Sequence, residues 1–154
     1  MSKDLKYFMQ DFSEEEIIKV PAPDRFKDDE GNPIEFEVKQ LTQAEIQRIF
    51  KLYRQKHVAT DKRGNPIVTN GEVAWKVDKD NDRAMRHIIV EALVYPNLKD
   101  KELMDFYKCV DVTEMPLKVF PKPDEYSTVT TAILRAIGIV SDFENDEDIE
   151  TAKN

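Results

Sequence analysis

The stretch from Ala92 to Tyr107, ALVYPNLKDKELMDFY, decides the fold together with Arg25 to Thr42, RFKDDEGNPIEFEVKQLT. Apolar side chains recur at helical spacing in the residues just before Ala92 and at the start of this stretch, until Tyr95-Pro96 ends the helix. A second apolar face begins after a corner of only a few residues, at Leu98, Leu103, Phe106 and Tyr107. This spacing predicts two helices that pack on each other and are joined at the corner.

The other stretch contains the second of two segments that have the composition of β-strands. Ile17 to Val20 is rich in β-branched residues, and apolar and charged side chains alternate from Ile34 to Val38. Gly31-Asn32-Pro33 between them favours a turn, because Gly accepts positive φ and Pro33 moves Asn32 out of the helical region. We expect a small antiparallel β unit here.

Helical patterns fill most of the remaining chain. Thr42 and Glu45 form a capping-box pattern that predicts a helix start at Gln43, and Pro123 suits the first position of the last helix. The expected helices span residues 43–55, 83–94 with Asp82 as N-cap, 99–108, 112–120 interrupted by Pro116, and 123 to a C-cap at Gly138. The predicted fold is therefore α+β: a mainly helical single domain over residues 1–140, with a small N-terminal antiparallel β unit.

Residues 60–80 are expected to form either a small exposed hairpin or a mobile loop. Asn70-Gly71 is a favourable hairpin turn between Ile67-Val68 and Val73 to Val77. Gly-Asn-Pro-Ile occurs here at 64–67, as it does at 31–34, and we interpret the repeat as shared turn chemistry. Trp75 either folds back to cover the core, which we prefer, or is an exposed anchor for a partner.

Composition excludes several classes of function. The chain of 154 residues has a net charge of −8, and much of its acidity lies in residues 141–154, which we expect to be a disordered acidic tail. An acidic chain without a concentrated basic face gains no counterion-release energy on nucleic acid. We also find neither a signal peptide nor an apolar run that could span a bilayer. We therefore expect neither nucleic-acid nor membrane binding.

No pattern of catalytic or metal-binding residues stands out. Cys109 is the single cysteine, so neither an internal disulfide nor a multi-cysteine zinc site can form, and we expect it to be half-buried and structural. The alternating Asp78, Asp80 and Asp82 resemble the start of a calcium loop. However, Arg83 and Ile89 stand where such a loop needs Gly and Glu. We expect no enzyme activity, no metal and no cofactor.

Several of these motifs together carry a resemblance to the XkdN-like tail assembly chaperones of tailed bacteriophages and prophages. Their order and spacing cover roughly residues 20 to 140, which is far more specific than one short pattern. The matching positions are Arg25-Phe26, Asp29-Glu30-Gly31-Asn32-Pro33, Leu41-Thr42 with Glu45, Val94-Tyr95-Pro96, Leu98-Lys99-Asp100, Glu102-Leu103 and Glu125-Tyr126.

The resemblance implies a helper protein in the host bacterial cytoplasm that binds the tape-measure protein during assembly and is absent from the finished virion. The tail tube protein is a further expected partner. The alternatives are a structural tail or connector component retained in the virion, and a small regulatory binding module. The resemblance itself identifies no contact residues and leaves the oligomeric state open.

Candidate contact residues come from the sequence pattern. Leu5, Phe8, Met9 and Phe12 would form an apolar stripe if residues 1–16, a candidate mobile segment, became helical; we prefer docking on the domain itself over partner binding. Tyr95 either shapes the helix corner, which we prefer, or contacts a partner. The predicted partner-binding residues are Leu5, Phe8, Phe12, Trp75, Tyr95, Asp142, Glu144, Asp146, Glu147 and Asp148.

Overall fold

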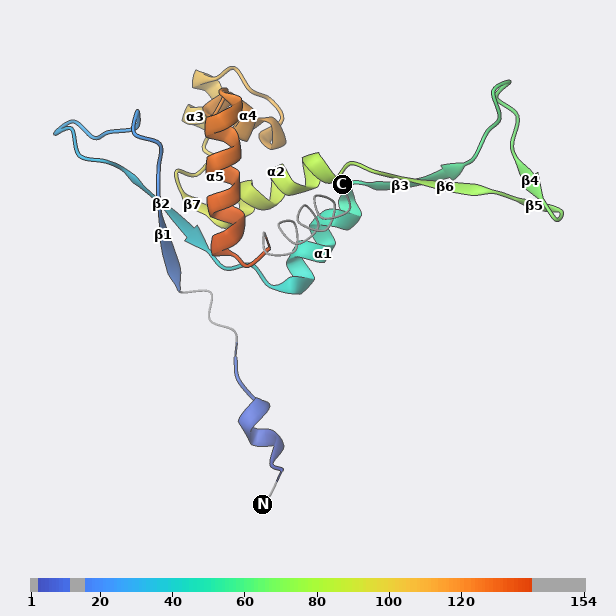
Figure 1. Cartoon of the computed structure of the whole chain (residues 1–154), viewed down its shortest axis with the longest axis horizontal. Coiled ribbons are helices and arrows are strands. Elements are labelled where there is room, and N and C mark those ends of the chain that lie inside the picture. The colour runs from blue at the N-terminus through green and yellow to red at the C-terminus, as the bar shows by residue number, and fades with distance from the viewer. Residues whose placement is uncertain (1–2, 12–15, 140–154) are drawn as a thin grey trace, which may run out of the picture.

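The computed structural model describes residues 3–11 and 16–139. Its helices and strands form a mixed α+β single domain that is about 41% helical and 23% strand. Figure 1 shows helices gathered beside a small sheet, with a long ribbon and the N-terminal segment projecting from them. The prediction of a mainly helical domain is therefore wrong, because the strands form three separate sheets and not one small unit.

The first sheet is antiparallel and has the strand order β1-β2-β7. β1 (Ile17–Pro21) pairs with β2 (Glu35–Lys39), placing Val20 opposite Phe36. This confirms the predicted β unit. β7 (Leu93–Tyr95) adds a third strand at residues that we expected to end a helix. Leu93 leaves the helix because it pairs with Val38, so a contact distant in sequence overrides the helical pattern.

The helices pack around α2 (Asn81–Ala92), whose apolar face lies entirely in the core. α1 (Gln43–Leu52), α4 (Met115–Val119) and α5 (Pro123–Ala136) all contact it. The predicted apolar faces of α1 and α5 are confirmed, since Ile46, Ile49, Val129, Ile133 and Leu134 are all buried. Shorter pieces complete the body: α3 (Lys101–Phe106) and the 3-10 helix η2 (Val112–Glu114).

The ends of the helices test the predicted caps. Thr42 Oγ1 accepts a hydrogen bond from the Glu45 backbone N–H at 3.1 Å, as the capping box predicts. Pro123 begins α5, and Gly138 follows its end with φ of +84°. The N-cap of α2 is Asp80, not Asp82, because the Asp80 carboxylate accepts from the Arg83 N–H at 3.1 Å. α1 ends at Leu52 and not at Gln55, because the chain turns there into a strand.

That strand, β3 (Arg54–Val58), pairs with β6 (Trp75–Lys79) to form the ribbon. Beyond it, β4 (Val68–Thr69) and β5 (Glu72–Val73) form the hairpin predicted around Asn70-Gly71. We call residues 54–79 the arm. In Figure 1 the arm extends well away from the body, and every residue of β6 is exposed.

Candidate partner-binding surfaces

The root of the arm is held between two helices of the body. The Asp80 backbone N–H donates to the Tyr53 carbonyl at 3.0 Å. This hydrogen bond joins the two ends of the arm, where the chain comes from α1 and where it continues into α2. The Tyr53 hydroxyl lies 2.6 Å from His87 Nδ1 on α2, and burial raises the pKa of Tyr53. These contacts attach the root of the arm to α1 and α2.

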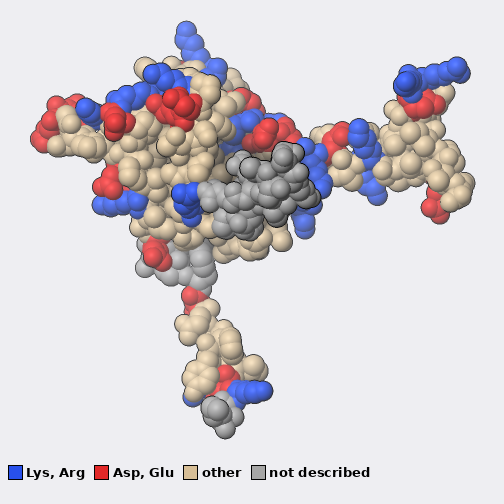
Figure 2. Space-filling model, in the orientation of Figure 1, with Lys and Arg blue, Asp and Glu red and all other residues tan. Residues whose placement is uncertain are grey.

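The two faces of the arm differ in chemistry. Cross-strand neighbours share a face, so Lys56 and Val77 lie together, as do Val58 and Trp75. We call this side the Trp75 face: Arg54, Lys56, Val58, Trp75, Val77 and Lys79. The opposite side, the His57 face, consists of Gln55, His57, Lys76 and Asp78. Lysine and arginine side chains follow the arm in Figure 2.

Trp75 does not cover the core, so the preferred sequence interpretation is wrong. Its side chain is 56% exposed, and Val77 beside it is 50% exposed. Lys56 Nζ lies 5.0 Å from the centroid of the indole ring, a cation–π contact made within the arm. The ribbon carries Trp75 away from the body, where the indole is available to a partner. Tryptophan in such a position is a residue type enriched at binding hot spots.

The N-terminal segment also presents apolar side chains. Leu5–Phe8 forms the 3-10 helix η1, capped by the Asp4 carboxylate, which accepts from the Lys6 N–H at 2.9 Å. Leu5 is 71% exposed and Phe8 is 85% exposed, so the expected docking onto the body is wrong for these residues. Phe12 lies outside the described residues, as do Asp142, Glu144, Asp146, Glu147 and Asp148 of the acidic tail. Their partner contacts remain predictions.

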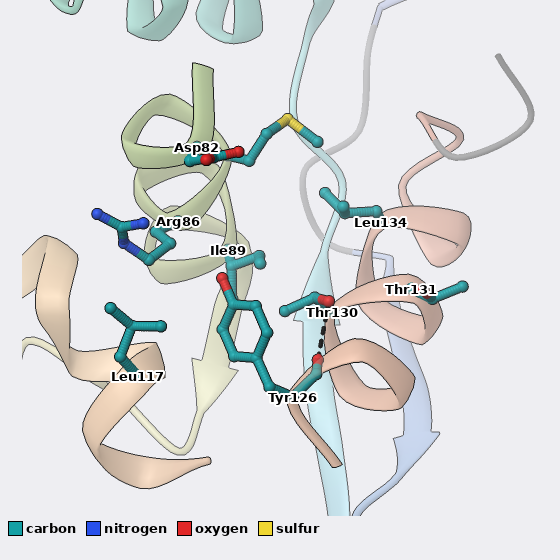
Figure 3. A pocket seen from close by; sticks show the side chains of 9 residues that line it. Asp82, Arg86, Ile89, Leu117, Tyr126, Thr130, Thr131 and Leu134 are labelled. Carbon is teal, nitrogen blue, oxygen red and sulfur yellow. Dashed lines mark hydrogen bonds between the residues drawn. The ribbon is translucent and has the colours of Figure 1, made fainter. Parts of the chain in front are cut away.

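A groove of about 460 Å³ opens between α2, α4 and α5. Figure 3 shows the Tyr126 ring of α5 directed toward Ile89 of α2, with Leu117 of α4 on the other side. Burial raises the pKa of Tyr126 above its ordinary value. The groove could receive an apolar side chain, with Asp82 and Arg86 beside it as the charged lining residues. The sequence pattern placed Asp82 at a helix N-terminus and gave no sign of the groove.

Tyr95 ends β7 and is half-exposed, so it belongs to a sheet and not to a corner between helices. It lines a smaller apolar depression of about 180 Å³ together with Pro96, Leu103 and Phe120. The structure therefore leaves Tyr95 open to a partner but separates it from Trp75 and from Leu5, which lie on different projections (Figure 1). Within residues 3–11 and 16–139, the predicted contact residues Leu5 and Phe8, Trp75, and Tyr95 therefore lie on three separate elements.

The described residues contain no cluster that suggests catalysis. Across 3–11 and 16–139, no group of three or more His, Cys, Asp or Glu side chains could hold a metal ion. None of the helices in those ranges is long and apolar enough to cross a membrane. Cys109 is half-buried, as predicted, and its Sγ lies 3.0 Å from the Asp111 carbonyl oxygen.

Two positions of the family resemblance meet in space although they lie far apart in sequence. Arg25 donates from Nε and Nη2 to the Glu125 carboxylate at 2.8 to 3.0 Å, and Nη2 also donates to the Val119 carbonyl at 2.6 Å. These hydrogen bonds hold the pKa of Glu125 below its usual range. The neighbouring Phe26 packs edge-on against Phe120, with centroids 6.0 Å apart. Arg25 and Glu125 therefore fasten the first hairpin to α5.

Known proteins match this chain over nearly its whole length. The family model described as phage XkdN-like tail assembly chaperone protein matches residues 5–153. The chain belongs to this family. It is 32% identical over 152 residues to the phage-like element PBSX protein XkdN of Bacillus subtilis strain 168, covering 98% of this chain and 94% of that protein.

A second relative can be compared both in sequence and in structure. The chain is 34% identical over 152 residues to the uncharacterized protein YqbN of the same strain, covering 98% of this chain and 93% of YqbN. A crystal structure of the protein YqbN superposes with a TM-score of 0.67 at 27% identity, covering 90% of this chain and 98% of that one. The chain is thus similar to YqbN in sequence and in fold.

Proposed function

We propose that this family member is a non-enzymatic chaperone that binds the tape-measure protein in the host cytoplasm and keeps it soluble while the tail tube assembles. One observation supports this most directly: both projections, η1 and the arm, present large apolar side chains to solvent. Exposed apolar patches on a folded protein mark interaction sites. Membership of a tail assembly chaperone family makes a tail component the natural partner.

The mechanism we infer is mass action. By covering apolar surface on a long, unassembled chain, the chaperone lowers the concentration of the free, aggregation-prone form. Tube subunits would then displace it, so the finished virion would lack it. Binding sites on two projections would let one molecule contact two stretches of the same chain, which raises the local concentration of the second contact.

The test is co-expression with the tape-measure protein encoded in the same phage genome. We expect the tape-measure protein to become soluble and to co-elute with the chaperone in size-exclusion chromatography. A variant that lacks residues 1–11 should reduce co-elution, because it removes Leu5 and Phe8 and leaves the body intact. Purified virions should contain no chaperone by mass spectrometry. Stoichiometric chaperone in virions would instead establish a structural tail or connector component.

A further inference from the structure

The Trp75 face of the arm has an unbalanced composition. It combines three cations, Arg54, Lys56 and Lys79, with the apolar Trp75 and Val77, and it carries no carboxylate. Among the described residues, none of these three cations forms an ion pair. The only acid of the ribbon strands, Asp78, lies on the opposite face, 3.3 Å from His57 Nδ1. The basic charge of the Trp75 face is therefore uncompensated within the described chain.

The arm as a whole is basic in an acidic protein. It carries Arg54, Lys56, Lys62, Arg63, Lys76 and Lys79 against Asp61, Glu72 and Asp78, whereas the complete chain has a net charge of −8. A two-stranded ribbon without a packed face is only marginally stable in water. Lysines on such a strand discourage pairing with other edges, but they do not account for an exposed tryptophan among them. Both features fit a face that a partner covers.

We propose that the Trp75 face is the docking surface for an acidic, amphipathic segment of the tape-measure protein. Apolar side chains of that segment would cover Trp75 and Val77, and its carboxylates would pair with Arg54, Lys56 and Lys79. Complementary charge sets the register of such a complex and speeds association, and the buried indole supplies most of the affinity. This inference rests on the proposed function and adds which surface binds and which partner chemistry it selects.

Nucleic acid fits the face less well. Stacking on an aromatic ring and phosphate contacts to lysines would both be available on the arm. However, the −8 charge of the whole chain would repel a polyphosphate, and Asp61, Glu72 and Asp78 lie along the same arm. A protein segment with a few carboxylates experiences much less of this repulsion. Nuclease treatment of the complex separates the two cases.

The experiment compares matched variants in affinity measurements with the co-expressed complex. Lys56→Glu and Lys76→Glu change the charge identically on neighbouring exposed positions of the ribbon, but on opposite faces. We expect Lys56→Glu to weaken binding about tenfold or more and Trp75→Ala about thirtyfold or more, as interfacial charges and hot-spot aromatics do. Lys76→Glu should change affinity by less than about threefold, since a rim charge acts mainly on association rate.

Cross-linking identifies the occupant directly. A photoreactive benzoylphenylalanine replaces Val77 on one face or Lys76 on the other, and cross-linked peptides are identified by mass spectrometry. The proposal expects Val77 cross-links to a tape-measure segment in which Asp and Glu outnumber Lys and Arg. Cross-links to a second copy of this chain, to its own residues 140–154, or to a segment without excess acid overturn it, as does loss of binding on nuclease treatment.

The two levels of proposal fail separately. If a complex forms and Lys56→Glu and Lys76→Glu weaken it equally, the docking face is wrong while the chaperone function stands. If no complex forms with the wild-type chain, both the proposed function and the proposed docking face are wrong. Thermal unfolding of each variant checks that the exposed substitutions leave the fold intact.

Discussion

The first hairpin and the arm carry the same loop but differ in what their strands contact. In the first hairpin the Asp28 carboxylate accepts from the backbone N–H groups of Glu30 and Asn32, at 2.9 and 2.8 Å. In the arm Asp61 accepts from Arg63 and Asn65, both at 2.9 Å. The shared turn chemistry predicted from Gly-Asn-Pro-Ile is thus confirmed.

The strands beside the two loops have opposite environments. β2 buries Phe36 and Val38 in the core, whereas β3 and β6 bury no residue. The difference lies in one strand of the arm: β2 and β6 both alternate apolar and charged residues, but β3, the partner of β6, is polar until its last position. The turn motif therefore accompanies the same local chain reversal in both hairpins, but only the hairpin with a row of apolar residues in both strands, β1 and β2, packs on the body.

The largest expected effect is a difference in the free energy of unfolding when an aromatic residue is removed from each hairpin. Phe36→Ala should lower the free energy of unfolding by about 3 to 5 kcal/mol, because Phe36 is buried and packs edge-on against Phe120 at 5.7 Å. Trp75→Ala should cost about 1 kcal/mol or less, since Trp75 is largely exposed and its neighbours Lys56 and Val58 lie on the same surface face. Urea denaturation followed by circular dichroism measures both. Equal losses would mean that the arm packs on the body.

The attachment of the first hairpin to α5 gives a second, smaller effect that depends on pH. Arg25 lowers the pKa of Glu125 below the ordinary 4.5 by hydrogen bonding. Because the folded-state pKa is depressed, this stabilisation is complete above the unfolded-state pKa and is lost as the pH falls through the folded-state value. Glu125→Gln should therefore cost about 1 to 2 kcal/mol at pH 7, and the difference from wild type should shrink on acidification from pH 5 to 3.

Other titrating groups are common to both proteins and serve as the control. The Thr113 hydroxyl and backbone N–H lower the pKa of Asp111, but this group is present in wild type and variant, so its contribution cancels. The measurement is urea denaturation of both proteins across this pH range. A stability difference that stays constant with pH would show that folding does not lower the pKa of Glu125.

The contrast between the hairpins also explains what the sequence could predict. Helix faces, the Thr42 cap, Pro123 as a helix start and the Asn70-Gly71 turn are local signals, and the structure contains each of them. β6 alternates apolar and charged residues from Trp75 to Asp78, but β3 is polar until Val58, so no periodicity marks Arg54–Val58 as a strand. β7 has three residues, too few for a pattern, and belongs to the sheet only through Val38 and Glu37.

The candidate site shows the same limit. Leu5 and Phe8 were predicted from helical spacing with Met9 and Phe12, and Trp75 as the single tryptophan of the predicted hairpin. Their exposure could not be read from the sequence, because it depends on what the rest of the chain covers. The Trp75 face needed the register of β3 against β6, which places Lys56 beside Val77 and leaves Lys76 on the other side. Once that strand pair is known, alternation alone assigns both faces.

The smallest expected effect tests whether the same substitution in the two matching loops lowers the global free energy of unfolding equally. Gly31 and Gly64 both have φ of +83°, and an added Cβ would meet no atom within 4 Å at either position. Alanine at either site therefore incurs the same conformational cost, about 1 kcal/mol, and no steric one. We expect Gly31→Ala to lower the global free energy of unfolding by that amount. Gly64→Ala should change it by less than about 0.5 kcal/mol, because the arm can open while the body stays folded.

Amide hydrogen exchange resolves where the loss appears. In Gly64→Ala, exchange should accelerate at the hydrogen-bonded amides of the β3–β6 ladder, such as that of Lys76 opposite His57, while Val38 in the core keeps its wild-type protection. In Gly31→Ala, protection should fall at Val38 as well, because the first hairpin opens only when the body does. Equal global losses from the two variants would instead make arm and body one cooperative unit. The arm would then be stabilised by the fold and not by its own loop and a bound partner.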